Sequence, residues 1–273
     1  MIDKFRKQFT KQKIQYMKKI FILAITILPL LFSSCSDDKK KVDEVIPEDK
    51  PGLNYNNNNG TINLSFAHFF GNTPLALNTN FITAAADTIR ISELKYYISN
   101  IQLMNEANQW VNLKTYHLID FSDVQSMANN LASGIPKGVY TKMRFLVGVD
   151  SAMNRAGVED GDLSPTNEMF WSWTADYIFF RLKGRFNTAN TPMSLDVGGN
   201  SNVGLVELDL TGLKKNGATT VTVPLKMDLD EVFKTPHTYD LKTMSSEIHT
   251  ASNPDAGKLR DNIVQGAFSV ITQ

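Results

Sequence analysis

Alternation of polar and apolar side chains is the strongest constraint on how this chain folds. From Thr61 onward the period is two residues, so that Ile62, Leu64 and Phe66 share one face with His68. This period is typical of β-strands with one buried face. Similar segments recur at short spacing, at residues 88–91, 96–103, 110–113, 116–120, 138–149, 206–210 and 219–225.

Short alternating segments separated by polar turns favour a sheet protein over a helical one. The part of the chain from residue 61 to 273 is long enough to bury a substantial core as one domain. We therefore predict an all-β, β-sandwich-like domain with a few short helices near the C-terminus. Helical turns are expected at 228–233, 243–250 and 258–264, before a closing strand at 266–271.

Two of the three tryptophans lie on alternate residues of an aromatic stretch, 169–180. Read as one strand, the stretch places Trp171 and Trp173 on the same face. The simplest interpretation is a buried core strand, because aromatic strands are usually buried.

The first 34 residues have the features of a signal peptide. Basic residues precede the apolar run 20–32, which is too short to span a bilayer, and small residues then lead to Cys35. We predict that residues 1–34 are removed, that Cys35 is lipidated, and that residues 35–60 form a flexible tether. The Ser-Asp-Asp after Cys35 resembles the export signal of Bacteroidetes-type lipoproteins. The expected location is the cell envelope, as an outer membrane lipoprotein on either face.

Charge and cysteine content exclude several classes of protein. Residues 1–34 hold seven of the 28 basic and one of the 28 acidic residues, so the remainder carries 21 basic and 27 acidic residues. Nucleic-acid binding is therefore not expected. Cys35 is the only cysteine, which leaves imidazole, carboxylate and methionine groups as metal ligands in the domain. The four histidines, at 68, 117, 237 and 249, show no metal-binding spacing, and each alone is more often a structural residue.

No motif of a nucleophile, phosphate-binding loop or metalloprotease is present, so we do not expect an enzyme. One acidic segment allows two interpretations, a calcium site or a solvated turn. Its oxygen-bearing residues are Asp150, Asn154, Glu159, Asp160 and Asp162.

An ordered series of short motifs resembles the MbnP-like family, whose members are secreted or lipid-anchored relatives of methanobactin-associated MbnP and of methanotroph surface copper-binding proteins. The motifs are residues 66–71 with 74–75, 94–100, 116–120, 145–150 with Asn154, 161–165, and 169–173 with 177–178. Each motif is weak alone, and the series is specific through its order.

The resemblance implies a β-rich domain that binds copper through histidines, near a tryptophan oxidised to kynurenine by a dihaem partner of the MbnH type. Carried over by position, His68 and His249 match the family's histidines, and Trp171 and Trp173 match its tryptophan pair. The leading hypothesis is a lipid-anchored protein for copper acquisition or handling. The alternative is an interaction module without metal, in which the tryptophans serve only the core; a hydrolase is the third and weakest reading.

Overall fold

The computed structural model describes residues 60–113, 116–136, 138–157, 159–174, 176–210, 214–215 and 220–271. The predicted signal peptide, Cys35 and all of the predicted tether except Gly60 lie outside these ranges. Gly60 itself opens the first strand. Within the described ranges, no helix combines the length and apolar character needed to cross a bilayer.

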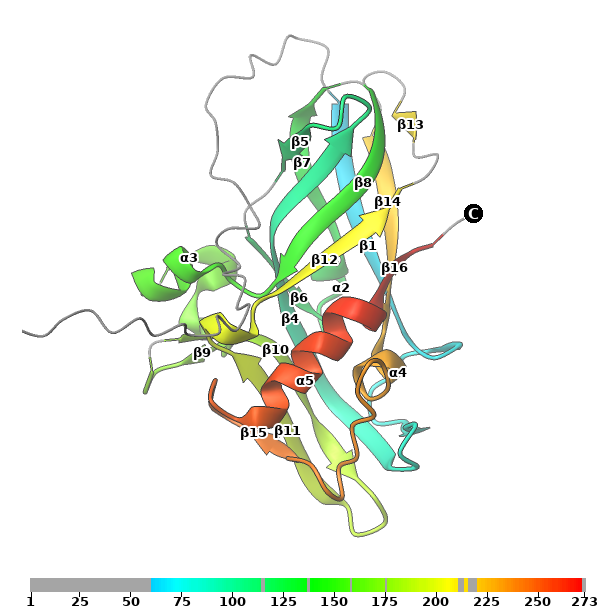
Figure 1. Cartoon of the computed structure of the whole chain (residues 1–273), viewed down its shortest axis with the longest axis vertical. Helices are drawn as coiled ribbons and strands as arrows, with labels where there is room; N and C mark the ends of the chain where they lie inside the picture. The colour runs from blue at the N-terminus through cyan, green and yellow to red at the C-terminus, as the bar shows by residue number, and fades with distance from the viewer. Residues whose placement is uncertain are drawn as a thin grey trace, which may run out of the picture. The chain divides into compact units, whose positions relative to one another are not determined.

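The smaller sheet has β1 (Gly60–Phe70) at its centre (Figure 1). β1 runs parallel to β14 (Thr220–Asp228) and antiparallel to β2 (Thr73–Pro74) and β7 (Ala128–Ile135), while β16 (Phe268–Val270) pairs with β14. Burial alternates along the whole of β1, with His68 on the buried face. The period-two prediction for this strand is confirmed.

The larger sheet is ordered β12-β8-β4-β10-β11-β15. Its longest strand is β4 (Thr88–Asn105), which joins two segments that the sequence presents as separate strands. The other strands on this path are β12 (Gly204–Asp209), β8 (Gly138–Val147), β10 (Asp176–Phe186), β11 (Thr191–Gly198) and β15 (Glu247–Ile248).

Short strands pair with three of the longer strands, β4, β8 and β10. The expected hairpin around residues 105–108 is present, because β5 (Trp110–Asn112) pairs antiparallel with β4. The remaining additions are β3 (Asn80–Ile82) and β6 (Tyr116–Asp120) on β4, β13 (Lys214–Lys215) on β8, and β9 (Phe170–Trp171) on β10.

Helices are few and short, as predicted. The C-terminal ones are α4 (Leu229–Val232) and α5 (Pro254–Asn262), and α5 continues into a π-helical turn, Ile263–Ala267. The helix expected at 243–250 is wrong: this segment forms turns and then β15, because β11 offers a free edge for Glu247 and Ile248 to pair with. Earlier in the chain lie α2 (Val124–Met127), α3 (Ser151–Ala156) and the 3-10 turns Gly161–Leu163, Pro165–Asn167 and Asn200–Asn202.

The two faces of the larger sheet bury different side chains. Alternation along β4 sends Tyr96 into the main core, which also holds the buried face of β1, whereas the next residue, Tyr97, joins a second cluster. We call these the inner face and the outer face. On β10, Phe180 and Leu182 belong to the inner face, and Arg181 therefore points to the outer face.

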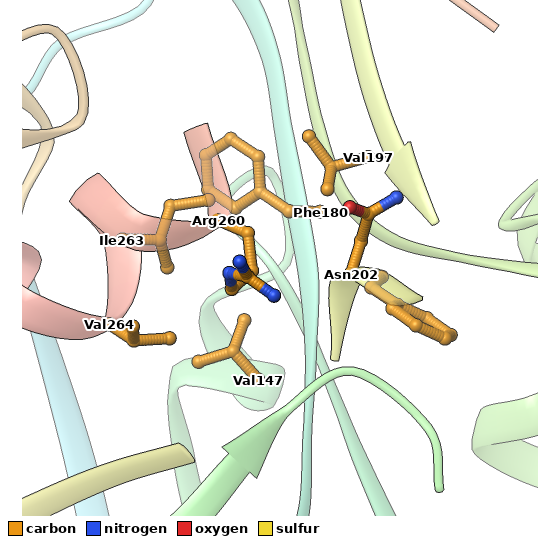
Figure 2. Close-up of a pocket in the computed structure, with 8 residues that line it drawn as sticks. Val147, Phe180, Val197, Asn202, Arg260, Ile263 and Val264 are labelled. Atoms are coloured by element: carbon orange, nitrogen blue, oxygen red, sulfur yellow. The ribbon is translucent and has the colours of Figure 1, made fainter. Parts of the chain in front are cut away.

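The helix α5 packs against β11, and its π-helical extension contacts β12 and β14. A small cavity lies at this junction (Figure 2). The volume in which the centre of a water molecule fits is about 10 Å³. That is room for about one water molecule. The cavity is lined by Val147, Phe179, Phe180, Val197, Asn202, Arg260, Ile263 and Val264.

Candidate functional site

His68 is a buried imidazole in the main core, with 6% of its surface exposed. Its Nε2 lies 3.0 Å from the hydroxyl of Tyr96, and its ring meets the ring of Phe121 edge-on at 5.0 Å between centroids. Its Nδ1 is buried and has no hydrogen-bond partner among the described residues. Burial lowers the pKa of His68 from 6.5 to about 4, so the ring is neutral at physiological pH.

Sequence reasoning missed the two residues that define the surroundings of His68. Within the part of the chain that the structure describes, Tyr96 supplies the only polar contact of the ring. Its own hydroxyl is so buried that its pKa is raised well above the ordinary value of 10. Met227 on β14 is the register partner of His68 and is fully buried in the same core. Only the pairing of β1 with β14, distant in sequence, could have revealed this neighbour.

The tryptophan stretch does not form the continuous strand that the sequence suggests. Residues 172–174 make a turn, with the amide of Thr174 donating to the carbonyl of Trp171, so that β9 and β10 form a hairpin. Trp171 is 1% exposed and Trp173 is 66% exposed. The interpretation of Trp173 as a core residue is therefore wrong, although the two indole rings remain neighbours at 6.2 Å between centroids.

Trp171 packs in the outer-face cluster against the end of β11. A Cβ atom on Gly198 would lie 3.0 Å from Cζ3 of its indole, so the ring rests on this glycine. The indole Nε1 is buried and lacks a hydrogen-bond partner. Trp171 therefore occupies an apolar site that leaves its one polar group unsatisfied.

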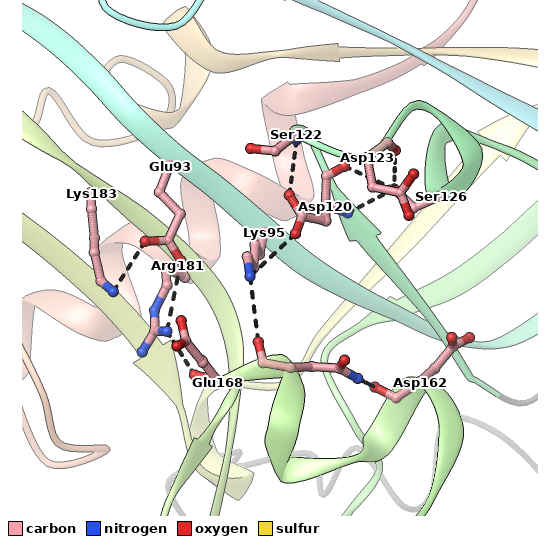
Figure 3. Close-up of polar contacts among 11 residues, drawn as sticks. Glu93, Lys95, Asp120, Ser122, Asp123, Ser126, Asp162, Glu168, Arg181 and Lys183 are labelled. Atoms are coloured by element: carbon pink, nitrogen blue, oxygen red, sulfur yellow. Dashed lines mark hydrogen bonds and ion pairs between the residues drawn. The ribbon is translucent and has the colours of Figure 1, made fainter.

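His249 lies near the same end of β11, directly after β15. Its side chain is 48% exposed, and its Nδ1 is 3.9 Å from Oδ2 of Asp196. Asp196 is held in turn by Arg181, whose Nε and Nη2 each donate to one carboxylate oxygen at 2.9 Å. Figure 3 shows Arg181 between Glu93 and Glu168, where it also donates to the carbonyl of Glu168 at 2.6 Å.

The structure brings Trp171 and His249 to one face and places His68 on the other. Asp196, which His249 approaches, and Gly198, on which Trp171 rests, are two residues apart and share the outer face of β11. His68 contacts Tyr96 from the inner side. The larger sheet thus stands between the two histidines, and the structure does not bring His68 and His249 into one site.

The remaining histidines have ordinary structural contacts. His117 is buried, with Nε2 at 2.7 Å from the carbonyl of Ser126 and Nδ1 at 3.4 Å from Asp162. His237 lies 3.3 Å from Asp261 at the surface. Among the residues that the structure describes, no three histidine, cysteine, aspartate or glutamate side chains gather closely enough to hold a metal ion.

Several oxygens of the acidic segment have roles in holding the loop. Asp150 caps α3 by accepting from the amides of Ala152 and Met153, and it also accepts a hydrogen bond from the hydroxyl of Tyr116. Asn154 is buried, and its amide nitrogen donates to Asp176. These contacts account for Asp150 and Asn154 as structural residues.

The architecture of the described residues places the chain in the class of β-sandwich-like domains with short helices. Comparison with known proteins then identifies the family. The chain belongs to the MbnP family, whose model, described as MbnP, matches residues 59–250, a range that includes both histidine candidates and both tryptophans.

The other comparisons concern individual proteins. Among solved structures, the chain is similar to MbnP from Methylosinus trichosporium, with 14% identity and a TM-score of 0.47, over 78% of this chain and 98% of that one. No curated protein matches the sequence.

Proposed function

We propose that this chain is a lipid-anchored envelope protein that binds copper, without being an enzyme, and serves copper acquisition or handling. Membership in the MbnP family supports the proposal, together with the resemblance of the motif series to copper-binding members. The observation that carries it is the buried Nδ1 of His68, a neutral imidazole nitrogen without a partner. Leaving a buried polar atom unsatisfied is costly, so such an atom calls for a ligand.

The groups around His68 suit a soft metal ion. Neutral imidazole and thioether sulfur are both copper ligands, and thioether selects Cu(I). Met227 stands opposite His68 in the pairing of β1 with β14 and shares its buried environment. His68 and Met227 would hold the ion, and the ion would supply redox or transfer chemistry when bound. Together these two residues supply two donor atoms, the imidazole nitrogen of His68 and the thioether sulfur of Met227.

The outer face offers the second part of the proposal, an oxidised tryptophan close to His249. Trp173 is the indole that an oxidising partner can reach, since two thirds of its surface is exposed. Trp171 lies beside it but is sealed from solvent. We therefore propose Trp173 as the first residue to be oxidised, by a dihaem partner of the MbnH type, with His249 as a separate outer-face ligand.

Metal binding is tested by titrating the purified chain with Cu(I) against a chromophoric chelator. His68→Leu should abolish binding at the inner site, His249→Gln should remove only an outer-face site, and Tyr96→Phe should retain binding because Nδ1 is untouched. His237→Gln is the matched control, since it removes a partly exposed histidine that lies 3.3 Å from Asp261. Unchanged copper binding in both His68→Leu and His249→Gln would refute the ligand assignment.

Tryptophan oxidation is tested by intact mass and peptide mapping of protein from its native host. Conversion of tryptophan to kynurenine gains one oxygen and loses one carbon. The modified peptide should contain Trp173, and Trp173→Phe should remove the mass change.

The exposure of Trp173 also favours a second candidate function, an interaction module that uses this ring as a contact without metal. Two unmodified tryptophans together with absent copper binding would favour that module.

A further inference from the structure

Arg144 is a buried cation that no carboxylate neutralises directly. It lies on β8 and is 8% exposed, and its only hydrogen bond to a described residue runs from Nε to Oε1 of Gln102 at 2.5 Å. Within the described ranges, no acidic oxygen comes within 4.0 Å of its guanidinium and no group accepts from its two terminal nitrogens. Neither terminal nitrogen is sealed from solvent.

The contrast with Arg181 shows that this arrangement is unusual within the protein. Arg181 is buried to a similar degree, 7% exposed, and Asp196 takes two of its nitrogens in a fork at 2.9 Å. A buried charge is normally paired in this way because desolvation is expensive. Arg144 is buried to the same degree but has no carboxylate partner among the described residues. The N–H groups of its two terminal nitrogens are therefore available as donors.

The side chain is held in place for binding. The ring of Trp110 on β5 covers one face of the guanidinium, with 4.0 Å from the guanidinium carbon to the ring centroid. Gln102, itself 4% exposed, accepts from Nε and donates to Asn112. These contacts come from β4, β5 and β8, which lie side by side in the upper part of Figure 1. A rigid donor loses little conformational entropy on binding.

The acidic residue opposite Arg144 is engaged elsewhere. Glu207 stands opposite Arg144 in the pairing of β8 with β12, but its carboxylate binds Nζ of Lys142 at 2.6 Å. Burial lowers the pKa of Arg144 and Glu207 raises it in part, and arginine remains charged at neutral pH. The site therefore keeps one positive charge that the neighbouring ion pair does not cancel.

We propose that Arg144, under the ring of Trp110 and oriented by Gln102, is a binding site for a small carboxylate. The terminal nitrogens of a guanidinium form a planar fork that matches the two oxygens of a carboxylate. Phosphate is the weaker candidate, because its higher charge calls for more than one cation and Lys142 is already paired. The indole beside the fork adds an apolar surface for the body of the ligand.

The test is an NMR titration of the full chain with sodium acetate at constant ionic strength, following the Nε–H signal of Arg144 and the indole N–H of Trp110. Both signals should move with a saturable dependence on acetate. Sodium chloride at the same strength should leave them in place. Equal shifts with chloride, or saturation by inorganic phosphate alone, would overturn the carboxylate assignment.

Two variants of Arg144 and one control complete the test. Arg144→Gln should abolish the saturable shift of Trp110, and Arg144→Lys, which keeps the charge but loses the fork, should weaken acetate binding at least about tenfold. Arg155→Gln removes the same charge from an exposed arginine that contacts Ser151, and it should bind acetate as the wild type does. Full binding in Arg144→Lys, or equal loss in Arg155→Gln, would contradict the proposal.

Discussion

At the scale of single residues, the burial of His68 makes the stability of the fold depend on pH. In the unfolded chain its pKa is 6.5, whereas burial in the folded protein lowers the pKa to about 4. The unfolded state therefore binds a proton first as the pH falls. The contribution of the neutral His68 ring to the free energy of unfolding is therefore fully present above pH 6.5. It is lost progressively as the pH falls to about 4, by about 3 kcal/mol in total.

This predicts a specific effect of His68→Leu on urea unfolding between pH 7.5 and pH 4.5. The wild type should lose more stability on acidification than the variant, because the variant has no ring to protonate at this position. His237→Gln, which changes a partly exposed histidine, should keep the wild-type slope. Equal slopes in the wild type and His68→Leu would show that the ring is not held neutral by burial.

Arg181 and Asp196 predict a different response, since both are almost fully buried. Asp196→Ala should lower the free energy of unfolding by about 3 to 5 kcal/mol, because it leaves the guanidinium buried without its carboxylate. The double variant Arg181→Met with Asp196→Leu should recover most of this loss. Chemical denaturation of the three proteins measures the effect, and a double variant no better than Asp196→Ala would contradict it.

Sequence alternation alone could place the side chain of His68 on the buried face of β1, and the structure agrees. It could not show that Nδ1 has no partner, that Tyr96 meets Nε2, or that Met227 is adjacent. The surroundings of His68 come from strands far from it in the chain, and alternation carries no information about which strands pair.

At the scale of elements, the tryptophan stretch shows where a period-two reading fails. The same alternation that predicts one strand is equally compatible with a tight turn between Trp171 and Asp176. Only packing distinguishes them: Trp171 is stabilised by resting on Gly198, whereas Trp173 is left at the tip. The aromatic content of the stretch therefore predicted the burial of Trp171 correctly and that of Trp173 wrongly.

Two glycines give opposite predictions at this scale. Gly198→Ala would place Cβ 2.5 Å from the carbonyl oxygen of Tyr177 and 3.0 Å from the ring of Trp171, so we expect a loss of about 2 kcal/mol and a shifted tryptophan fluorescence. Gly257→Ala lies in α5 with open space around Cβ, and it should stabilise the protein by about 0.5–1 kcal/mol. Thermal unfolding of both variants provides the measurement, and destabilisation by both would contradict the assigned packing.

At the scale of the whole molecule, the class of fold was predictable and its topology was not. Short alternating strands implied packed sheets, which the structure confirms. The parallel pairing of β1 with β14 joins the beginning of the domain to a segment about 160 residues later, with His68 opposite Met227. Such a pairing rests on the shape of the assembled core, because neither strand carries a local signal for its partner.

The proposed membrane anchor also concerns the whole molecule. We predict that membrane attachment depends on lipid at Cys35, the only cysteine of the sequence. Cys35→Ser keeps the size of the side chain but removes the thiol that the predicted lipid needs. Dual acyl chains anchor a protein stably, whereas the acidic domain has no basic surface excess to hold it to anionic lipid.

In the native host, the Cys35→Ser protein should therefore leave the membrane fraction, and its intact mass should lack the acyl groups found on the wild type. Ser33→Ala is the matched control, since alanine preserves a small side chain before the cysteine and should leave the protein in the membrane fraction. If the Cys35→Ser protein stayed with membranes through a high-salt wash, attachment would have to come from another part of the chain. Because the predicted tether separates Cys35 from β1, the folding stability of the domain should be the same in both variants.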